Sequence, residues 1–281
     1  MKILVCDRLE EKVLDKFEEL GEITNISESK TKTEDLKSNI VDTEIVVIRS
    51  GTKINKDILE NANNLKIIAR CGVGVDNVDV EEATNKKIYV TNSPNANIIS
   101  VAELTIGLII SAARKIHVSN NSLKDKKWDR NKFLGTELYQ KQLGLVGFGK
   151  AAKEVAKRLS AFGMNIVFYD PYVDSSTIEA KKVDLDELLK TSDVISIHVV
   201  KTEETTNLIN NEKLNLIKKG GILVNTSRGG IIDEESLFQK ANEDLIFAGL
   251  DVFSQEPPDI NETFSKSNIV TTPHLGASTY E

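Results

Sequence analysis

Short apolar runs alternate with amphipathic segments along almost the whole chain, and this alternation is the feature that most restricts its fold. The apolar runs have the length of buried strands, and the segments between them have the spacing of helices with one apolar face. Strands that alternate with helices form βαβ units, whose strands are parallel. The chain is therefore predicted to have an α/β fold with parallel sheets. Strands are expected at residues 3–6, 22–26, 45–48, 66–70, 88–91, 143–147, 165–169, 194–198, 222–225, 247–250 and 268–270.

The alternation is interrupted near the middle of the chain, which predicts two domains. Asn92-Ser93-Pro94-Asn95 ends the first series, because a proline disfavours helix in the residue before it. A long helix is expected over residues 98–117, and the second series begins at Gln142. A chain of 281 residues is long enough for two cores. We expect a first domain over residues 1–96 and a second over residues 97–275.

The segment between the two series, residues 119–140, is charged and has no strand pattern. It contains Trp128 and Phe133 among polar residues. An exposed connector would have this composition, and so would an arm that clasps a second subunit through its aromatic residues. Both interpretations remain open at this point.

The charge of the chain excludes some classes of function. The formal net charge is −7, from 36 basic and 43 acidic residues, which argues against binding to nucleic acids or to a membrane surface. The apolar run before Asp7 is too short for a signal peptide. Cys6 and Cys71 lack the spacing of metal ligands, so no metal site is expected, and their use indicates a reducing compartment. We expect a cytoplasmic protein.

A glycine-rich turn follows the strand that is expected at residues 143–147. Gly147-x-Gly149-x-x-Ala152 fits the pattern in which a tight turn brings the start of a helix against a pyrophosphate. Asp170 ends the next strand, where an acid binds the ribose hydroxyl groups of NAD and repels the 2′-phosphate of NADP. A structural glycine turn with a capping aspartate has the same sequence, but NAD is the cofactor that this context favours.

The chain has three histidines, of which His274 is the candidate for catalysis. His117 is expected to close the long helix, and His198 ends a strand, where packing and a place near a cofactor are equally compatible. His274 follows the last strand, at the sheet edge where open α/β sheets bind ligands. Arg228 and Glu256 follow the two preceding strands. Arginine matches a carboxylate in geometry, histidine transfers protons near neutral pH, and a carboxylate orients an imidazole.

These motifs together resemble the D-isomer-specific 2-hydroxyacid dehydrogenases over essentially the whole chain. The resemblance is carried by Ile48-Arg49-Ser50, residues 70–79, residues 127–138, the glycine turn, Ser227-Arg228-Gly229-Gly230, Asp251-Val252-Phe253 with Glu256-Pro257-Pro258, and residues 273–279. Within the family the chain is most similar to the branch that oxidises 3-phospho-D-glycerate with NAD, the first step of serine synthesis. Other branches, such as the hydroxypyruvate and glyoxylate reductases, and a non-catalytic NAD-sensing protein remain alternatives.

The resemblance implies a flavodoxin-like substrate domain, a Rossmann domain that binds NAD, and roles for individual residues. Arg228, Glu256 and His274 would be catalytic. Arg49 and Arg70 would bind the substrate phosphate, and the backbone amides of Gly72, Val73 and Gly74 its carboxylate. The NAD site would be lined by Gly147, Gly149, Lys150, Ala151, Asp170, Val199, Thr226, Ser227, Asp251, Gly276 and Ala277, with Asp251 near the nicotinamide amide.

The resemblance also implies a homodimer or larger homo-oligomer, held by the arm around Trp128, with Arg130 or Lys132 reaching the partner. Two departures from the family are expected to matter. His198-Val199-Val200 stands where the family has His-Thr-Pro, which removes a hydroxyl group near the cofactor phosphates. Family members also continue past the position of Glu281 into a helix that returns to the first domain. Residues 276–281 are therefore expected to lead back toward residues 1–96, and feedback by serine through an added domain is not expected.

Overall fold

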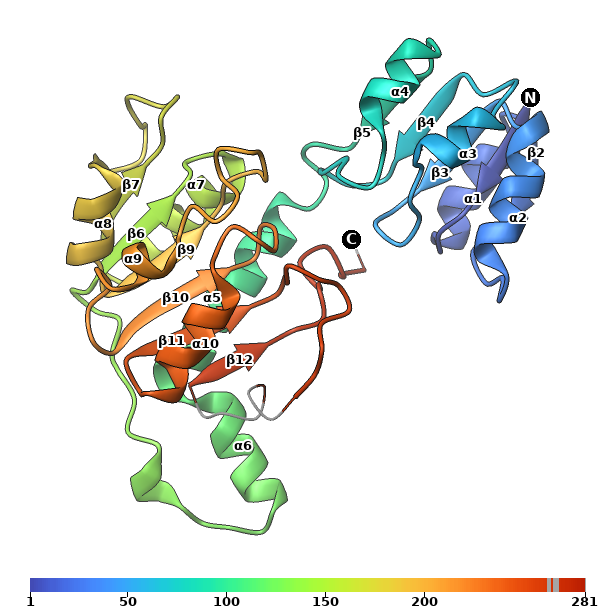
Figure 1. The fold of residues 1–281 in the computed structure, drawn as a ribbon. Coiled ribbons are helices and arrows are strands. Elements are labelled where there is room, and N and C mark those ends of the chain that lie inside the picture. Colours follow the sequence, from blue (N-terminus) through green and yellow to red (C-terminus); the bar gives the residue numbers. More distant parts are fainter. Residues whose placement is uncertain (262–263, 265–267, 281) are drawn as a thin grey trace. The chain divides into compact units, whose positions relative to one another are not determined.

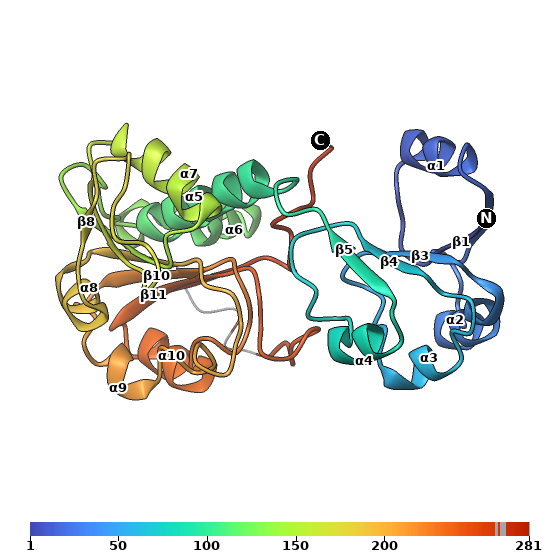
Figure 2. The same cartoon turned by 90° about the horizontal axis from the view of Figure 1, so that it is seen from above.

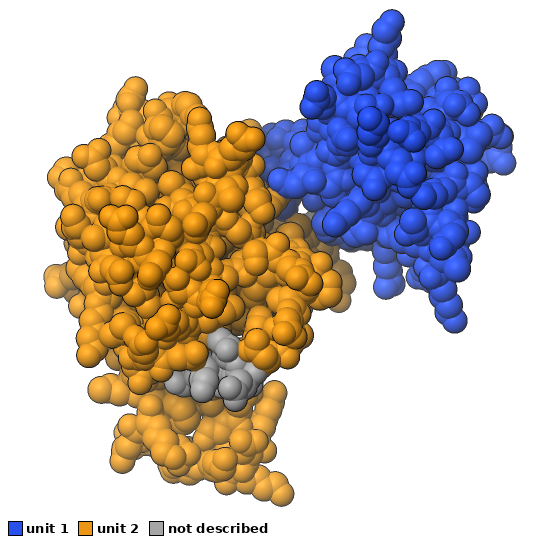
Figure 3. All heavy atoms as spheres, in the orientation of Figure 1, with its two compact units in different colours: residues 1–97 blue, residues 98–281 orange. Residues whose placement is uncertain are grey.

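The chain divides into two compact units, each built around its own parallel sheet. A computed structural model describes residues 1–261, 264 and 268–280 (Figures 1 and 2). Unit 1 is Met1–Asn97 and unit 2 is Ile98–Glu281, which Figure 3 colours separately. Residues 276–280 group with unit 2, where the Thr279 hydroxyl lies 3.2 Å from that of Ser100.

Unit 1 contains a five-stranded sheet in which every neighbouring pair of strands is parallel. Its strands are β1 (Lys2–Val5), β2 (Glu22–Asn25), β3 (Ile45–Ile48), β4 (Ile67–Arg70) and β5 (Tyr89–Asn92). Their order is β2-β1-β3-β4-β5, which is the flavodoxin-like order. The strand order reverses between β1 and β3, so a ligand site is expected outside the carboxyl ends of these two strands.

Helices cover both faces of this sheet (Figure 2). Helix α1 (Glu11–Glu18) packs Leu14 and Phe17 against Val5 and its neighbours. The opposite face is covered by α2 (Lys32–Asn39), α3 (Lys56–Glu60) and α4 (Val80–Asn85), with a 3₁₀ turn, η1 (Ile40–Asp42), after α2. The core on this side is continuous and includes Leu4, Leu36, Val46, Ile48, Leu59, Ile68 and Ala83.

Unit 2 contains a seven-stranded parallel sheet with the order β12-β11-β10-β9-β6-β7-β8. The strands are β6 (Gln142–Val146), β7 (Asn165–Tyr169), β8 (Lys181–Lys182), β9 (Val194–Ile197), β10 (Gly221–Asn225), β11 (Ile246–Leu250) and β12 (Ile269–Thr271). Six of them follow the order 3-2-1-4-5-6 of a Rossmann fold, and β12 extends the sheet at one edge. The predicted α/β class with flavodoxin-like and Rossmann sheets is confirmed.

The helices of unit 2 lie in two layers. Helices α5 (Ile98–Arg114) and α7 (Lys150–Ser160) cover one face, while α8 (Leu185–Thr191), α9 (Asn211–Leu214) and α10 (Glu234–Asn242) cover the other (Figure 2). No helix in the described part of the chain is both long and apolar enough to cross a membrane.

The predicted helix over residues 98–117 is wrong at its end. Helix α5 stops at Arg114, Lys115 takes the left-handed conformation (φ 52°), and a second helix, α6 (Ile116–Lys124), runs into the arm (Figure 1). The Thr136 amide, which comes back from the arm, donates to the Ala113 carbonyl at 2.8 Å. This tertiary hydrogen bond satisfies a carbonyl at the helix end, and periodicity alone does not reveal it. The arm also contains a 3₁₀ turn, η2 (Arg130–Lys132).

Two glycines of unit 2 provide a matched test of the packing. A Cβ at Gly144 in β6 would collide with the Ser192 hydroxyl and lie 2.5 Å from Leu188 Cδ2, whereas a Cβ at Gly107 in α5 has no neighbour within 4 Å. We expect Gly144→Ala to lower the free energy of unfolding by about 1–3 kcal/mol because the core is overpacked. Gly107→Ala should raise it by up to about 1 kcal/mol, because alanine favours helix. Urea unfolding measures both, and equal stability of the two variants would contradict this packing.

Candidate active site

The glycine turn of unit 2 leaves space for a diphosphate. Gly147 follows β6 and has a left-handed backbone (φ 86°), and Gly149 is the N-cap of α7. A side chain at Gly147 would meet the His198 carbonyl oxygen at 2.8 Å and Val199 Cγ1 at 2.9 Å, whereas a Cβ at Gly149 has no neighbour within 4 Å. The N-terminus of α7 therefore lies beside open space, which fits an anionic ligand. Lys150 and Ala151 form the first turn of this helix.

Asp170 follows β7 and lies beside this turn. Its Oδ2 accepts from the Phe148 amide at 2.8 Å, and its Oδ1 accepts from the amides of Tyr172 and Val173 at 2.8 and 3.1 Å. The carboxylate thus ties the glycine turn to the loop after β7. A carboxylate oxygen can accept more than one hydrogen bond, so these contacts leave acceptor capacity for ribose hydroxyl groups.

The loop that carries Arg228 is held by a buried asparagine at the end of β10. Asn225, which is 2% exposed, donates from Nδ2 to the Arg228 carbonyl at 2.8 Å and accepts at Oδ1 from the Ser227 amide at 3.0 Å. The half-buried Arg228 donates from Nη1 to the Ser227 carbonyl at 2.7 Å. Thr226 shares a 2.7 Å hydrogen bond with the buried hydroxyl of Thr105 in α5. Asn225 and Thr105 were not singled out in the sequence, since neither carries the chemistry itself.

Glu256 and His274 form a hydrogen-bonded pair. Nδ1 of His274 lies 2.7 Å from Oε2 of Glu256, and Oε1 of Glu256 accepts from the Phe253 amide at 3.1 Å. Both side chains are 37% exposed. A carboxylate that binds Nδ1 leaves Nε2 of the imidazole available for a proton transfer. The pair borders a largely apolar pocket of about 540 Å³, lined also by Phe253, Pro257, Ile260 and Phe264.

The loop of His274 depends on the buried carboxylate of Asp251. His274 itself has a left-handed backbone (φ 55°), which is uncommon for a residue with a Cβ. Asp251, which is 0% exposed, accepts from the Thr272 hydroxyl at 2.6 Å, the Leu275 amide at 2.7 Å and the Gly276 amide at 2.9 Å. Asp251 was expected near the nicotinamide amide, and these contacts give its carboxylate a structural task as well.

A glutamate of α10 joins the loops that carry Arg228 and Glu256. Oε1 of Glu234 accepts from the Ser254 amide at 2.6 Å and from the Gly230 amide at 3.4 Å. The two loops also touch, because a Cβ at Gly229 would collide with the Phe253 carbonyl. The carboxyl ends of β10, β11 and β12, which are neighbours in the sheet, therefore bring Arg228, Glu256 and His274 to one edge of unit 2.

The other two histidines have different surroundings. His198 shares a 2.9 Å hydrogen bond between Nε2 and the Ser196 hydroxyl, and burial lowers the pKa of its imidazole to about 4. His117 does not close the long helix as expected. It is the second residue of α6, because α5 ends at Arg114, and its Nδ1 lies 3.3 Å from the Ser111 hydroxyl.

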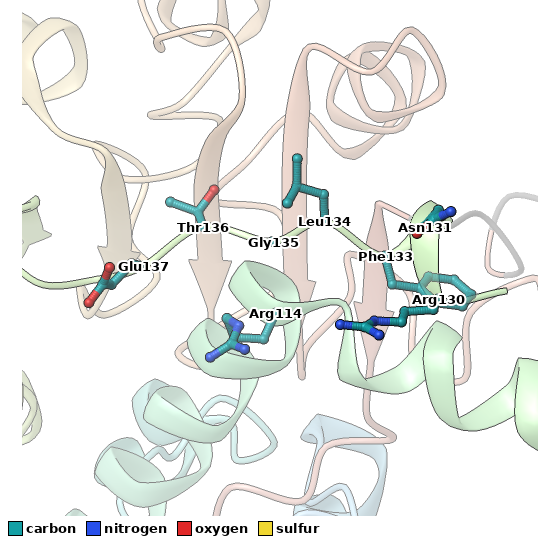
Figure 4. A pocket seen from close by; sticks show the side chains of 8 residues that line it. All are labelled: Arg114, Arg130, Asn131, Phe133, Leu134, Gly135, Thr136 and Glu137. Carbon is teal, nitrogen blue, oxygen red and sulfur yellow. The ribbon is translucent and has the colours of Figure 1, made fainter. Parts of the chain in front are cut away.

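The arm carries a pocket of its own, of about 700 Å³ (Figure 4). Arg114, Arg130, Phe133 and Leu134 are among the residues that line it. None of Arg228, Glu256 and His274 lines this pocket, so we do not assign the chemistry to it. Trp128 and Leu134 of the arm are 82% and 85% exposed, and exposed apolar side chains of this size are typical of an interface.

The substrate-binding candidates of unit 1 lie at the carboxyl ends of β3 and β4. Within the described residues, the guanidinium of Arg49 makes no ion pair. The Arg70 guanidinium folds over Gly72, whose φ of 152° requires a residue without a Cβ. The Val73 side chain is exposed. The Gly72 amide donates within the loop, to the Arg70 carbonyl at 2.9 Å. Gly74 follows in the same loop.

Comparisons with known proteins give the family. Residues 106–276 match the model of the NAD binding domain of the D-isomer specific 2-hydroxyacid dehydrogenases. The whole chain is 48% identical to the D-3-phosphoglycerate dehydrogenase of Methanocaldococcus jannaschii, of which it covers 54%. It is 45% identical to the hydroxypyruvate reductase of Thermotoga maritima, of which it covers 92%. The chain belongs to the D-isomer-specific 2-hydroxyacid dehydrogenase family, and its second unit contains the NAD-binding domain of that family.

Solved structures agree with this assignment. The TT0316 protein from Thermus thermophilus is similar over 99% of this chain and 91% of its own, with a TM-score of 0.92 and 33% identity. A D-lactate dehydrogenase from Aquifex aeolicus, solved with NAD and lactic acid, is similar over 100% of this chain and 90% of its own, with a TM-score of 0.86 and 27% identity. The chain spans about half the length of several phosphoglycerate dehydrogenases that it matches, such as the one from M. jannaschii.

The open space at Gly149 makes a prediction about cofactor binding. We expect Gly149→Val to fold normally, since a Cβ at this position meets no protein atom within 4 Å, but to weaken NADH binding by about tenfold or more because the side chain occupies the diphosphate position. Titration of NADH fluorescence measures the affinity, with Gly107→Ala as the control. An unchanged affinity would show that the dinucleotide does not cross this turn.

The low pKa of His198 predicts a pH dependence of stability. An unfolded histidine binds its proton near pH 6.5, whereas folded His198 binds it only near pH 4. The contribution to stability is therefore complete above pH 6.5 and is lost as the pH falls toward 4. Urea unfolding between pH 7 and 4 should show a shallower decline in His198→Gln than in the wild type. An identical slope in the two proteins would contradict a His198 that stays neutral in the folded protein down to about pH 4.

Proposed function

We propose that the protein oxidises 3-phospho-D-glycerate to 3-phosphohydroxypyruvate with NAD. The observation that carries the proposal is the 2.7 Å hydrogen bond between Glu256 and His274, at the edge of the same Rossmann sheet that carries the glycine turn. An imidazole oriented by a carboxylate beside a dinucleotide site is the arrangement that an alcohol oxidation needs.

The reaction assigns a separate task to each catalytic residue. NAD, when bound, accepts the hydride that leaves C2 of the substrate. Nε2 of His274 takes the proton of the C2 hydroxyl group, and Glu256 stabilises the resulting imidazolium through Nδ1. Arg228 binds the substrate carboxylate and the hydroxyl oxygen, which becomes the carbonyl oxygen of the keto acid. In the reverse direction His274 returns the proton to that oxygen.

The cofactor residues keep the tasks that the sequence suggests. Gly147, Gly149, Lys150 and Ala151 bind the diphosphate, and Asp170 binds the ribose. The remaining proposed NAD residues, which all follow strands of the same sheet, are Val199, Thr226, Ser227, Asp251, Gly276 and Ala277. Among the described residues no cluster of three or more side chains could hold a metal ion, and the proposed reaction needs none.

The preference for a phosphorylated acid rests on unit 1. Arg49 and Arg70 are proposed to bind the phosphate, and the loop of Gly72, Val73 and Gly74 the carboxylate. The Arg49 guanidinium, which follows β3 and makes no ion pair with the described residues, supports this assignment, because a phosphate dianion is bound best by planar cations. The name of the M. jannaschii relative points to the same substrate. The T. maritima relative supports a second candidate, the reduction of hydroxypyruvate, since the chain matches 92% of that protein.

The arm is proposed to hold a homodimer, because Trp128 and Leu134 are too exposed and too apolar for a surface that stays in water. The cytoplasm is the proposed location, since both described cysteines, Cys6 and Cys71, are free thiols.

The experiment that tests the function is a spectrophotometric assay of NADH formation. We expect phosphoglycerate to be oxidised with a higher kcat/KM than D-glycerate or D-lactate. His274→Asn, which suits the left-handed backbone, should lower kcat by about 10²–10⁴ and leave NADH binding intact, because only the proton acceptor is lost. Higher activity with hydroxypyruvate and NADH would support the second candidate instead. NAD binding without turnover of any 2-hydroxy acid would overturn both and favour a non-catalytic sensor.

A further inference from the structure

An ion pair between Asp7 and Lys32 lies at the point where the strand order of unit 1 reverses. Asp7 follows β1 and Arg49 follows β3, on either side of this reversal. Asp7 is 7% exposed, and its Oδ2 accepts from the Arg49 amide at 2.6 Å. Its Oδ1 accepts from Nζ of Lys32 at 2.6 Å. Lys32 begins α2, the helix between β2 and β3. Its bond to Asp7 therefore holds a residue that is distant in sequence at the carboxyl ends of β1 and β3.

The Lys32 ammonium lies beside the loop that follows β3. A Cβ at Gly51 would lie 2.8 Å from Oδ1 of Asp7 and 3.8 Å from Nζ of Lys32. The loop can pass this close to the pair because residue 51 has no side chain. Lys32 keeps 29% of its side chain exposed, compared with 9% for Asp7. The Lys32 side chain is therefore held by a buried carboxylate and stays partly exposed.

Two further cations belong to the same edge. Arg49 follows β3 and Arg70 ends β4, and these two strands are neighbours in the sheet. Burial raises the pKa of the Cys71 thiol beside them, while the charges of Arg49 and Arg70 act on it in the opposite direction. A phosphate monoester carries a charge of about −1.5 to −2 at neutral pH. The carboxyl edge of this sheet thus offers an ammonium and two guanidinium groups to such a dianion, within a chain whose formal net charge is −7.

We propose that Lys32, oriented by Asp7, is the third cation of the phosphate subsite and helps to determine the preference for a phosphorylated 2-hydroxy acid. An ammonium group has three donors, so Lys32 can keep its bond to Asp7 and donate another to a phosphate oxygen. Asp7 is a positioning residue, since it fixes both the ammonium and the backbone of Arg49. This inference rests on the proposed function for the identity of the substrate.

Steady-state kinetics of the full chain test the proposal. Lys32→Met keeps an unbranched side chain that is one atom shorter and removes its charge. We expect it to raise the KM for phosphoglycerate about tenfold, with kcat within about twofold and the KM for D-glycerate unchanged, because one charge-assisted hydrogen bond to phosphate is lost. Lys37→Met is the matched control on the same helix, since Lys37 pairs with Asp57 and not with Asp7. Lys32→Arg should restore most of the affinity.

Loss of the ammonium also leaves the Asp7 carboxylate buried without its partner, which can destabilise unit 1. The double variant Asp7→Asn with Lys32→Met removes both charges and keeps an oxygen that accepts from the Arg49 amide. It should fold as the wild type does and retain the selective rise in KM. A KM for phosphoglycerate that changes no more than that for D-glycerate in the two variants would overturn the proposal.

A binding measurement separates this inference from the proposed function. Inorganic phosphate should raise the melting temperature of the wild type and of Lys37→Met more than that of the double variant. If the wild type shows no preference for phosphoglycerate but this difference persists, the proposed substrate is wrong and the anion subsite stands. If the preference is present and phosphate stabilises all three proteins equally, the role of Lys32 is wrong and the proposed function stands.

Discussion

The candidate active site depends on the hydrogen bonds that the buried carboxylate of Asp251 accepts from the loop after β12. This carboxylate is inaccessible to water and is satisfied by the Thr272 hydroxyl and the amides of Leu275 and Gly276. A buried charge is tolerated only when hydrogen bonds replace its hydration, so the loop after β12 must wrap around this group. That wrapping puts His274 into a left-handed conformation and directs its imidazole toward Glu256. The geometry of the Glu256–His274 pair thus follows from the need to give the buried Asp251 carboxylate hydrogen-bond donors in place of water.

Parallel sheets explain why the functional residues of each unit come from distant parts of the sequence. Every strand of a parallel sheet ends at the same edge, so loops that are separated by a whole βα unit become neighbours. In unit 2 this edge gathers the glycine turn, Asp170, Arg228 and His274, and in unit 1 it gathers Asp7, Arg49 and Arg70. The two edges differ in chemistry. The first combines the Glu256–His274 pair with the glycine turn, and the second combines Arg49 and Arg70 with the carboxylate of Asp7.

Much of this organisation could be predicted from the sequence, because it depends on local patterns. The apolar runs predict the strands to within about one residue at most ends, and β3 and β7 agree at both ends. The edge strand β8 has only two residues, both lysines, and no apolar pattern reveals it. The end of α5 depends on the hydrogen bond between Ala113 and Thr136, which are 23 positions apart. The ion pair of Lys32 with Asp7 joins residues that are 25 positions apart. Such contacts arise from tertiary packing, which periodicity does not describe.

The position of Glu234 has a mechanical consequence. This residue begins α10, and its carboxylate holds the amides of both Gly230 and Ser254. A helix is stiff along its axis, and the first turn of α10 is fixed by the Asp233 cap on Ser236. The loops that carry Arg228 and Glu256 are consequently anchored to one rigid body rather than to two strands that could shift separately. Because one carboxylate holds both backbones, we expect the two loops to move together in thermal motion rather than separately.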